Sequence, residues 1–201
     1  MRGYQLSLLK DMVVELGERK TQVILSQFSC PLNRDVEAFL HNNAIEFAKQ
    51  GIASTHLVSA FHRDKPVIIG YFTLANKNII VSNNSMSNTQ RKRINKFGVY
   101  DPDRKGYRIA APLIAQLGKN YSNGYDKLIT GDELLLLACQ QVAQVQEIIG
   151  GKFVYLECED NLKLIDFYAS NGFVNFGIRQ LDKDEKDLFE GNFLIQMLRY
   201  L

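Results

Sequence analysis

The sequence predicts an α/β (α+β) protein with a mixed, largely antiparallel sheet of about seven strands flanked by helices. Three observations support this class: a core-forming composition of 46% hydrophobic residues, many short strand-like runs, and helical stretches between several of them. The runs are too numerous for a purely doubly wound fold and alternate too often with helices for a sandwich. We therefore expect one domain over residues 1–201 with a basic insertion at about 76–108.

The first elements are predicted from residue type and spacing. Residues 22–28 are rich in β-branched and large apolar residues, which predicts a strand. A helix should follow, with Asn33 as its N-cap and Gly51 at its end. Its buried face is predicted by apolar residues at three- and four-residue spacing, namely Val36, Phe39, Leu40, Ala44, Phe47 and Ala48.

The middle of the chain predicts a hairpin followed by a long polar segment. Residues 54–61 and 67–74 are strand-like runs joined by a short polar link. Residues 76–108 contain Asn, Ser, Lys and Arg with short apolar stretches, so we expect an extended loop or a mobile insertion. Residues 111–117 predict the next strand.

The last third alternates strands and helices. Thr130 and Glu133 form a predicted capping box at the start of a long helix from about 132 to 149. After it we expect a strand, a short helix and two further strands, at residues 152–158, 162–169, 173–178 and 191–201.

Charge and cysteine content limit the function classes. Residues 76–108 carry eight basic and two acidic residues, so this segment is cationic although the net charge of the chain is +2. Apolar runs are too short to span a bilayer and residues 1–20 are too charged for a signal peptide, so we expect a cytoplasmic protein. Three cysteines and three histidines show no metal-ligand spacing, so no metal is expected.

A block near the C-terminus carries a family resemblance. Asn161 follows a predicted strand, Tyr168 comes seven residues later, and Gly172 with Phe173 opens the next strand. This block resembles the second conserved half of the GNAT acyltransferase superfamily. The resemblance implies an N-acetyltransferase that uses acetyl-CoA, with Asn161 binding the pantetheine arm and Tyr168 protonating the leaving thiolate. Without it, Tyr168 would be a packing residue and Gly172 a helix stop.

The first conserved half of the family is matched in part. Residues 113–120 resemble the strand whose backbone pairs with pantetheine, through Leu117, Gly118 and Lys119. The following loop resembles the pyrophosphate loop, and its predicted binding residues are Lys127, Ile129, Thr130, Gly131 and Asp132. Asp126 stands where the family has Gln or Arg, and Ile129 replaces a glycine and would narrow the loop. The capping box would also occupy two of the amides that a phosphate needs.

Two further residues are candidates for deprotonating or orienting the amine substrate. Glu157, at the end of the strand before Asn161, can accept a proton from the incoming ammonium, or can be a solvated charge. Gln116 can orient the substrate. No Ser or Cys nucleophile motif is present, so we expect direct attack of a primary amine on the thioester in a ternary complex.

A looser resemblance, in residues 70–75, 89–94 and 112–117, is to the GNAT toxins that acetylate aminoacyl-tRNA. It implies tRNA as a partner, contacted by Arg91, Lys92, Arg93 and Lys96; a solvated basic loop is the alternative. A non-catalytic GNAT-like nucleic-acid-binding module is the alternative of another class. The sequence also leaves a homodimer open.

Overall fold

The computed structural model describes residues 3–83, 86–181 and 192–201. The strands are β1 (Gln5–Leu8), β2 (Ser54–His62), β3 (Lys65–Ser82), β4 (Val99–Asp101), β5 (Gly106–Lys119), β6 (Phe153–Cys158), β7 (Val174–Gln180) and β8 (Phe193–Tyr200). The helices are α1 (Leu9–Leu16), α2 (Glu18–Leu25), α3 (Arg34–Asn42), α4 (Ala44–Gln50), α5 (Asn88–Ile94), α6 (Gly131–Ile149) and α7 (Leu162–Ser170), with a 3-10 segment at Ser122–Leu128. The part of the predicted last strand before residue 192 lies outside the described residues.

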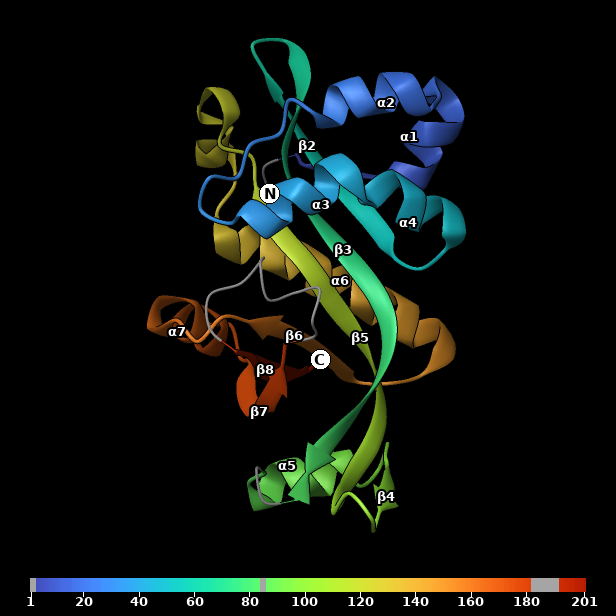
Figure 1. The fold of residues 1–201 in the computed structure, drawn as a ribbon, viewed down its shortest axis with the longest axis vertical. Helices are drawn as coiled ribbons and strands as arrows, with labels where there is room; N and C mark the ends of the chain where they lie inside the picture. Colours follow the sequence, from blue (N-terminus) through green and yellow to red (C-terminus); the bar gives the residue numbers. More distant parts are fainter. Residues whose placement is uncertain (1–2, 84–85, 182–191) are drawn as a thin grey trace. The chain divides into compact units, whose positions relative to one another are not determined.

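The described strands are hydrogen-bonded in the order β1-β2-β3-β5-β6-β8-β7, and β4 pairs with β5 (Figure 1). The β5–β6 pair is parallel and joins Leu113 to Tyr155 and Ile114 to Leu156. The pairs β1–β2, β2–β3, β4–β5, β6–β8 and β7–β8 are antiparallel. The predicted mixed, largely antiparallel sheet with helices is therefore confirmed, as is the hairpin of β2 and β3.

The chain divides into two compact units. Unit 1 contains residues 1–75 and 115–138, and unit 2 contains residues 76–114 and 139–201. Strands β3 and β5 and helix α6 each contribute residues to both units. None of the helices in the described residues combines the length and the apolar composition that a membrane span requires.

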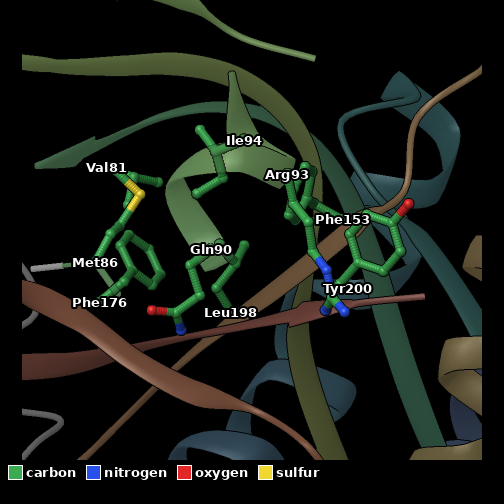
Figure 2. A pocket seen from close by; sticks show the side chains of 9 residues that line it. All are labelled: Val81, Met86, Gln90, Arg93, Ile94, Phe153, Phe176, Leu198 and Tyr200. Carbon is green, nitrogen blue, oxygen red and sulfur yellow. The ribbon is translucent and has the colours of Figure 1, made fainter. Parts of the chain in front are cut away.

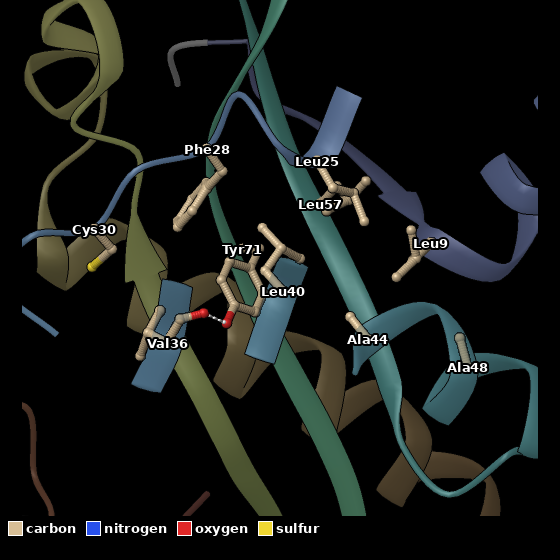
Figure 3. Packing of buried hydrophobic residues seen from close by; sticks show 10 residues of the cluster. All are labelled: Leu9, Leu25, Phe28, Cys30, Val36, Leu40, Ala44, Ala48, Leu57 and Tyr71. Carbon is tan, nitrogen blue, oxygen red and sulfur yellow. Dashed lines mark hydrogen bonds between the residues drawn. The ribbon is translucent and has the colours of Figure 1, made fainter. Parts of the chain in front are cut away.

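Neighbouring residues of β3 show how helices cover the two faces of the sheet in unit 1. Tyr71 donates a hydrogen bond to the Val36 carbonyl of α3 at 2.5 Å. At Gly70, a Cβ atom would meet Leu134 of α6 at 3.3 Å. Successive residues of a strand face opposite sides, so α3 and α6 cover opposite faces. The α3 side holds the buried cluster shown in Figure 3, formed by Leu9, Leu25, Phe28, Cys30, Val36, Leu40, Ala44, Ala48, Leu57 and Tyr71.

The predicted strand at residues 22–28 is wrong, because this segment is the end of α2 and the loop after it. Thr21 and Leu25 are buried four residues apart, on one face of a helix, whereas Val23 is exposed. Leu25 packs in the same buried cluster as Leu9 of α1. Tertiary burial therefore outweighs the weak strand preference of the β-branched residues.

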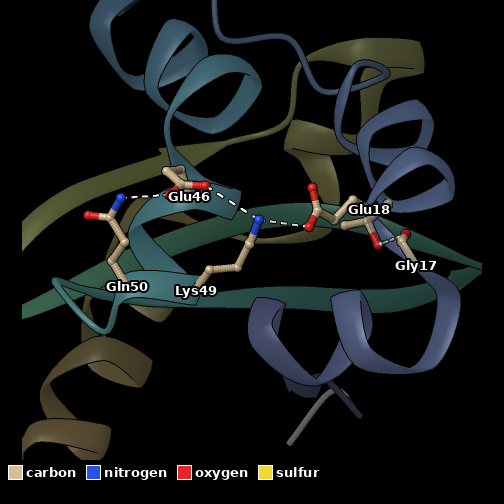
Figure 4. Close-up of polar contacts among 6 residues, drawn as sticks. Gly17, Glu18, Glu46, Lys49 and Gln50 are labelled. Atoms are coloured by element: carbon tan, nitrogen blue, oxygen red, sulfur yellow. Dashed lines mark hydrogen bonds and ion pairs between the residues drawn. The ribbon is translucent and has the colours of Figure 1, made fainter.

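The predicted helix from Asn33 to Gly51 is two helices, α3 and α4, that meet at Asn43. Its predicted ends are confirmed: Asn33 Oδ1 accepts a hydrogen bond from the Val36 amide at 3.1 Å, and Gly51 is left-handed with φ 70°. On the surface, Lys49 Nζ of α4 lies 2.8 Å from Glu18 Oε1 of α2 (Figure 4). Solvent screens this exposed pair, so the buried cluster holds the helices together.

The prediction of a loop at residues 76–108 is also wrong. This segment contains the last part of β3, helix α5, strand β4 and the start of β5. A capping box begins α5: Gln90 N donates to Ser87 Oγ at 3.3 Å and Ser87 N donates to Gln90 Oε1 at 2.7 Å. The few apolar residues of the segment are ordered because they enter the buried cluster of unit 2, formed by Ile79, Val81, Met86, Ile94, Ile109, Ala111, Phe153, Tyr155, Phe176 and Leu198.

Candidate active site

The predicted site residues fall into two groups, one in each unit. Unit 1 holds the predicted cofactor-binding strand and loop, with Gln116, Leu117, Gly118, Lys119, Lys127, Ile129, Thr130, Gly131 and Asp132. Unit 2 holds the predicted catalytic and basic residues, Glu157, Asn161, Tyr168, Arg91, Lys92, Arg93 and Lys96. Each group has its own geometry.

The segment predicted to receive the pyrophosphate ends in the predicted capping box. Thr130 N donates to Glu133 Oε2 at 2.8 Å, and Glu133 N donates to Thr130 Oγ1 at 3.1 Å. Ile129 precedes the box in an extended conformation with its side chain only 1% exposed. The expectation that Ile129 narrows the loop is therefore wrong, because its side chain enters the core and only its backbone can face a ligand.

The donors at this helix N-terminus fit a phosphate in part. Gly131 is the first residue of α6, and its amide has no partner within the helix. Lys119 Nζ lies within 3.1 Å of the Asp126 carbonyl, so it is held at the loop, and Lys127 is exposed. Asp132 and the Glu133 carboxylate of the capping box add negative charge to the first turn of α6, which disfavours an anion there. The backbone amides and the two lysines favour the binding of a pyrophosphate, and the acidic residues of the first turn of α6 weaken that binding.

The side chains of the predicted pantetheine strand are engaged by unit 1 itself. Gln116 Nε2 donates to Asp35 Oδ2 of α3 at 2.8 Å, so this side chain ties a strand to a helix. Leu117 is half-buried, and a side chain at Gly118 would collide with Val36 of α3. The backbone of this strand is therefore the part that can pair with pantetheine.

Asn120, which the sequence did not single out, anchors the loop after β5. Its amide and Nδ2 donate to the carbonyls of Ile69 and Ile68, each at 2.8 Å. Its Oδ1 accepts hydrogen bonds from the amides of Ser29 at 3.1 Å and Ser122 at 3.0 Å. This buried side chain thus ties β3 to the start of the phosphate-loop segment. The sequence pattern that could have indicated this role is an Asn directly after a strand and before a polar loop.

Tyr168 of α7 packs against aromatic neighbours and carries a phenol whose pKa is raised. Its half-buried ring lies between Phe167 and Phe173, with ring centroids at 5.0 and 6.0 Å, so it packs α7. Burial raises the pKa of the Tyr168 phenol, and negative charge on Cys158 raises it further. The phenol therefore keeps its proton through the neutral range, as a general acid must.

Cys158 is unsuited to covalent catalysis. Burial, followed by the charges of Glu159 and Asp160, raises the pKa of the Cys158 thiol to about 11. The thiol is protonated at neutral pH, and the thiolate is the nucleophilic form. This fits the expectation of direct attack by the amine.

Glu157 occupies the centre of a hydrogen-bonded group on three neighbouring strands. Its Oε2 accepts from Arg179 Nε of β7 and its Oε1 accepts from Gln196 Nε2 of β8, both at 2.8 Å. The Glu157 side chain is largely buried, at 14% exposure. Arg179 and Gln196 therefore hold the carboxylate in place, and each oxygen keeps a further lone pair.

Asn161 is the N-cap of α7. Its Oδ1 accepts a hydrogen bond from the Lys163 amide at 3.0 Å. Within the described residues, the Nδ2 group has no protein partner. The Nδ2 group can therefore donate to pantetheine as predicted, whereas Oδ1 already accepts a hydrogen bond from the helix.

The four predicted RNA-contacting residues lie in or directly after α5. Arg91 is half-buried and its Nη2 donates to the Asn83 carbonyl at 3.0 Å. The Arg93 guanidinium lies 4.8 Å from the centroid of the Tyr200 ring (Figure 2). Lys92 and Lys96 are exposed. Three of the four cations are therefore open to an anionic partner.

The GNAT-like fold predicted from the sequence is confirmed, because proteins of known structure, among them AtaT and KacT, share it. AtaT complexed with acetyl-methionyl-tRNAfMet has a TM-score of 0.60 and 16% identity, covering 96% of this chain and 94% of that one. A mutant of KacT has a TM-score of 0.60 and 16% identity, covering 96% of this chain and 93% of that one. AtaTR bound with AcCoA has a TM-score of 0.56 and 17% identity, covering 97% of this chain and 93% of that one. No protein-family model and no curated protein sequence matches the chain.

Proposed function

We propose that the protein is an acetyl-CoA-dependent N-acetyltransferase whose acceptor is the α-amino group of an aminoacyl-tRNA. The observation that carries the proposal is the likeness to AtaT, a structure that contains acetyl-methionyl-tRNAfMet, over nearly the whole length of both chains. The likeness to AtaTR bound with AcCoA supports the same co-substrate. The more general proposal is that the protein acetylates a primary amine of a small molecule or a protein.

In unit 1, the proposed role of the loop and strand is to bind acetyl-CoA. The backbone of residues 117–119 pairs with the pantetheine arm, and the Gly131 amide with Lys119 and Lys127 holds the pyrophosphate. When bound, acetyl-CoA supplies an acetyl thioester with a thiolate leaving group. Asn120 supports this role, because its four hydrogen bonds fix the start of the loop.

In unit 2, Tyr168 is the proposed general acid that gives its proton to the leaving sulfur. Because its pKa is raised, the Tyr168 phenol is protonated at neutral pH. Within the described residues, no protein group forms a hydrogen bond with its hydroxyl. Asn161 is the proposed donor to a pantetheine carbonyl through its Nδ2 group.

The protonation state of the acceptor favours an α-amino group over other amines. Arg179 and Gln196 each donate to one oxygen of Glu157 and hold this carboxylate in place. An α-amino group with a pKa of about 7.7–8.0 is about a quarter neutral near neutral pH, whereas a lysine-like amine is about 0.1% neutral. An acceptor that is already partly neutral needs no strong base.

Transfer of labelled acetyl groups tests the proposal. Purified protein is given radiolabelled acetyl-CoA with methionyl-tRNA, uncharged tRNA or spermidine, and acid-precipitable or amine-bound label is counted. Label on methionyl-tRNA alone is the expected result. Label on spermidine alone would show that the protein is an acetyltransferase whose acceptor is a small amine and not an aminoacyl-tRNA. No transfer, together with no acetyl-CoA binding by calorimetry at millimolar concentration, would favour the non-catalytic nucleic-acid-binding module.

A further inference from the structure

Unit 2 carries an aromatic cluster that the proposed acetyl transfer does not use. Phe97, Phe153 and Tyr200 pack with ring centroids 5.4 to 6.3 Å apart. Phe153 is buried, but Phe97 is 43% exposed and Tyr200 is 40% exposed. Large aromatic rings that are left this open at the edge of a core provide surface for a partner.

Positive charge lies beside these rings. The Arg93 guanidinium lies over the Tyr200 ring, and Lys96 directly precedes Phe97 in the chain. Among the described residues of the basic segment, the ion pair formed is that of Arg108 with Asp101. The charges of Lys92, Arg93 and Lys96 are therefore not neutralised by a protein carboxylate within ion-pair distance in that part of the chain.

The adjoining hollow is too small to enclose a ligand. Figure 2 shows it between α5 and the strands of unit 2, lined by Arg93, Phe153, Phe176, Leu198 and Tyr200 among others. Its volume of about 40 Å³ is far below the roughly 300–1,000 Å³ of pockets that bind small molecules. A planar group must therefore lie against the open outer surface of the rings.

We propose that Tyr200 and Phe97 form a stacking surface for an unpaired base of RNA, while Lys92, Arg93 and Lys96 contact the flanking phosphates. Aromatic rings interleaved with cations are the chemistry by which proteins bind single strands. A second copy of the chain would bring the same positive charge against this face. The proposal rests on the proposed function for the identity of the RNA, whereas the binding needs no acetyl transfer.

A single-stranded RNA of about 12 nucleotides containing 2-aminopurine is the probe, because its fluorescence reports stacking. Affinity and fluorescence are measured for the full chain and for Tyr200→Ala, Tyr200→Phe and Phe97→Ala. Tyr100→Ala is the matched control, since Tyr100 is a tyrosine of unit 2 with 46% exposure whose ring packs on Tyr107 instead.

Stacking predicts that Tyr200→Ala and Phe97→Ala each weaken binding by about 5- to 150-fold and alter the fluorescence change. Tyr200→Phe, which keeps a ring, and Tyr100→Ala should bind like the wild type. Lys96→Gln should lower the dependence of log affinity on log salt by about 0.7, one phosphate contact. Near-ultraviolet circular dichroism shows that each variant is folded.

Equal affinity of the Ala variants and the wild type for the RNA overturns the proposal. So does loss of self-association in Tyr200→Ala, measured by light scattering, when RNA affinity is unchanged, because the surface would then hold a second copy. Acetyl-CoA binding is measured on the same preparations. If RNA binds through Tyr200 and acetyl-CoA does not bind, the proposed enzyme fails and the stacking surface stands.

Discussion

Gly118 of β5 lies so close to Val36 of α3 that any side chain at position 118 would collide with Val36 Cγ1. The sequence placed Gly118 in the cofactor-binding strand. Its small size is explained by this contact within unit 1, where the Val36 carbonyl also accepts the hydrogen bond of Tyr71. The helix α3 therefore fixes the strand whose backbone is proposed to bind pantetheine.

Replacing Gly118 should cost stability through this contact. Gly118→Ala is expected to lower the free energy of unfolding by about 1–3 kcal/mol, because the core must shift to admit a methyl group. In a Val36→Ala background the same change should cost less, since the colliding methyl is gone. Urea unfolding of the four proteins of the cycle gives the coupling. Gly3→Ala, at a site with open space, is the neutral control, and strictly additive costs would contradict the contact.

The acidic first turn of α6 should weaken acetyl-CoA binding. Glu133→Gln keeps a side chain that can complete the capping box but removes its charge. Acetyl-CoA should then bind about 2- to 10-fold more tightly, because an anion near a helix N-terminus no longer meets this carboxylate. Calorimetric titration measures the change. Glu147→Gln, an exposed acid near the far end of the same helix, should leave the affinity unaltered; an equal gain there would mean a general charge effect.

Removing the hydroxyl of Tyr168 should separate catalysis from binding. Tyr168→Phe is expected to lower turnover by about tenfold or more with little change in acetyl-CoA affinity, because only the proton donor is lost. Steady-state kinetics and calorimetry measure the two quantities, with Tyr107→Phe as the control. Since the pKa of Tyr168 is raised, the wild-type rate should hold to higher pH than the ordinary phenol value would allow. Undiminished turnover in Tyr168→Phe would remove the residue from the mechanism.

His56 should make the fold sensitive to acid. Burial, with the imidazole stacked on Phe72, lowers the pKa of His56 from 6.5 to about 4. The unfolded chain takes up a proton as pH falls below about 6.5, and the folded chain does so only near pH 4. The stability due to neutral His56 is therefore present above the unfolded pKa and lost as pH falls toward the folded one.

Between about pH 7 and pH 5, this residue should account for about 2 kcal/mol of lost unfolding free energy. His56→Phe retains a ring against Phe72 and removes the titration. Its urea-unfolding free energy should fall by about 2 kcal/mol less than that of the wild type over the same interval. Identical pH dependence of the two proteins would show that His56 does not contribute.

Elements with strong local signals were predictable. The Asn33 cap, the capping box of Thr130 and Glu133, and the left-handed Gly51 all occur as expected, because each depends on residues within a few positions. The capping box of Ser87 and Gln90 gave an equally local signal for α5. The charged and polar residues around this capping box favour the prediction of a loop, whereas the box itself begins a helix.

Elements that depend on distant partners were not predictable in this way. Residues 22–28 have strand composition but are helical where Leu25 packs in one buried cluster with Leu9. The engagement of Glu157 by Arg179 and Gln196 joins residues that are 22 and 39 positions apart. No local pattern encodes which side chain will meet that carboxylate.

The sequence by itself determined the class of fold, the two half-motifs that resemble GNAT acyltransferases, and the cationic character of residues 76–108. Only the tertiary structure decided that Gly118 packs against Val36, that the Ile129 side chain enters the core, and that the Arg93 guanidinium lies near the Tyr200 ring. The reason is physical: periodicity, caps and net charge are set by neighbours along the chain. The contacts of a side chain are set by which surfaces are buried together.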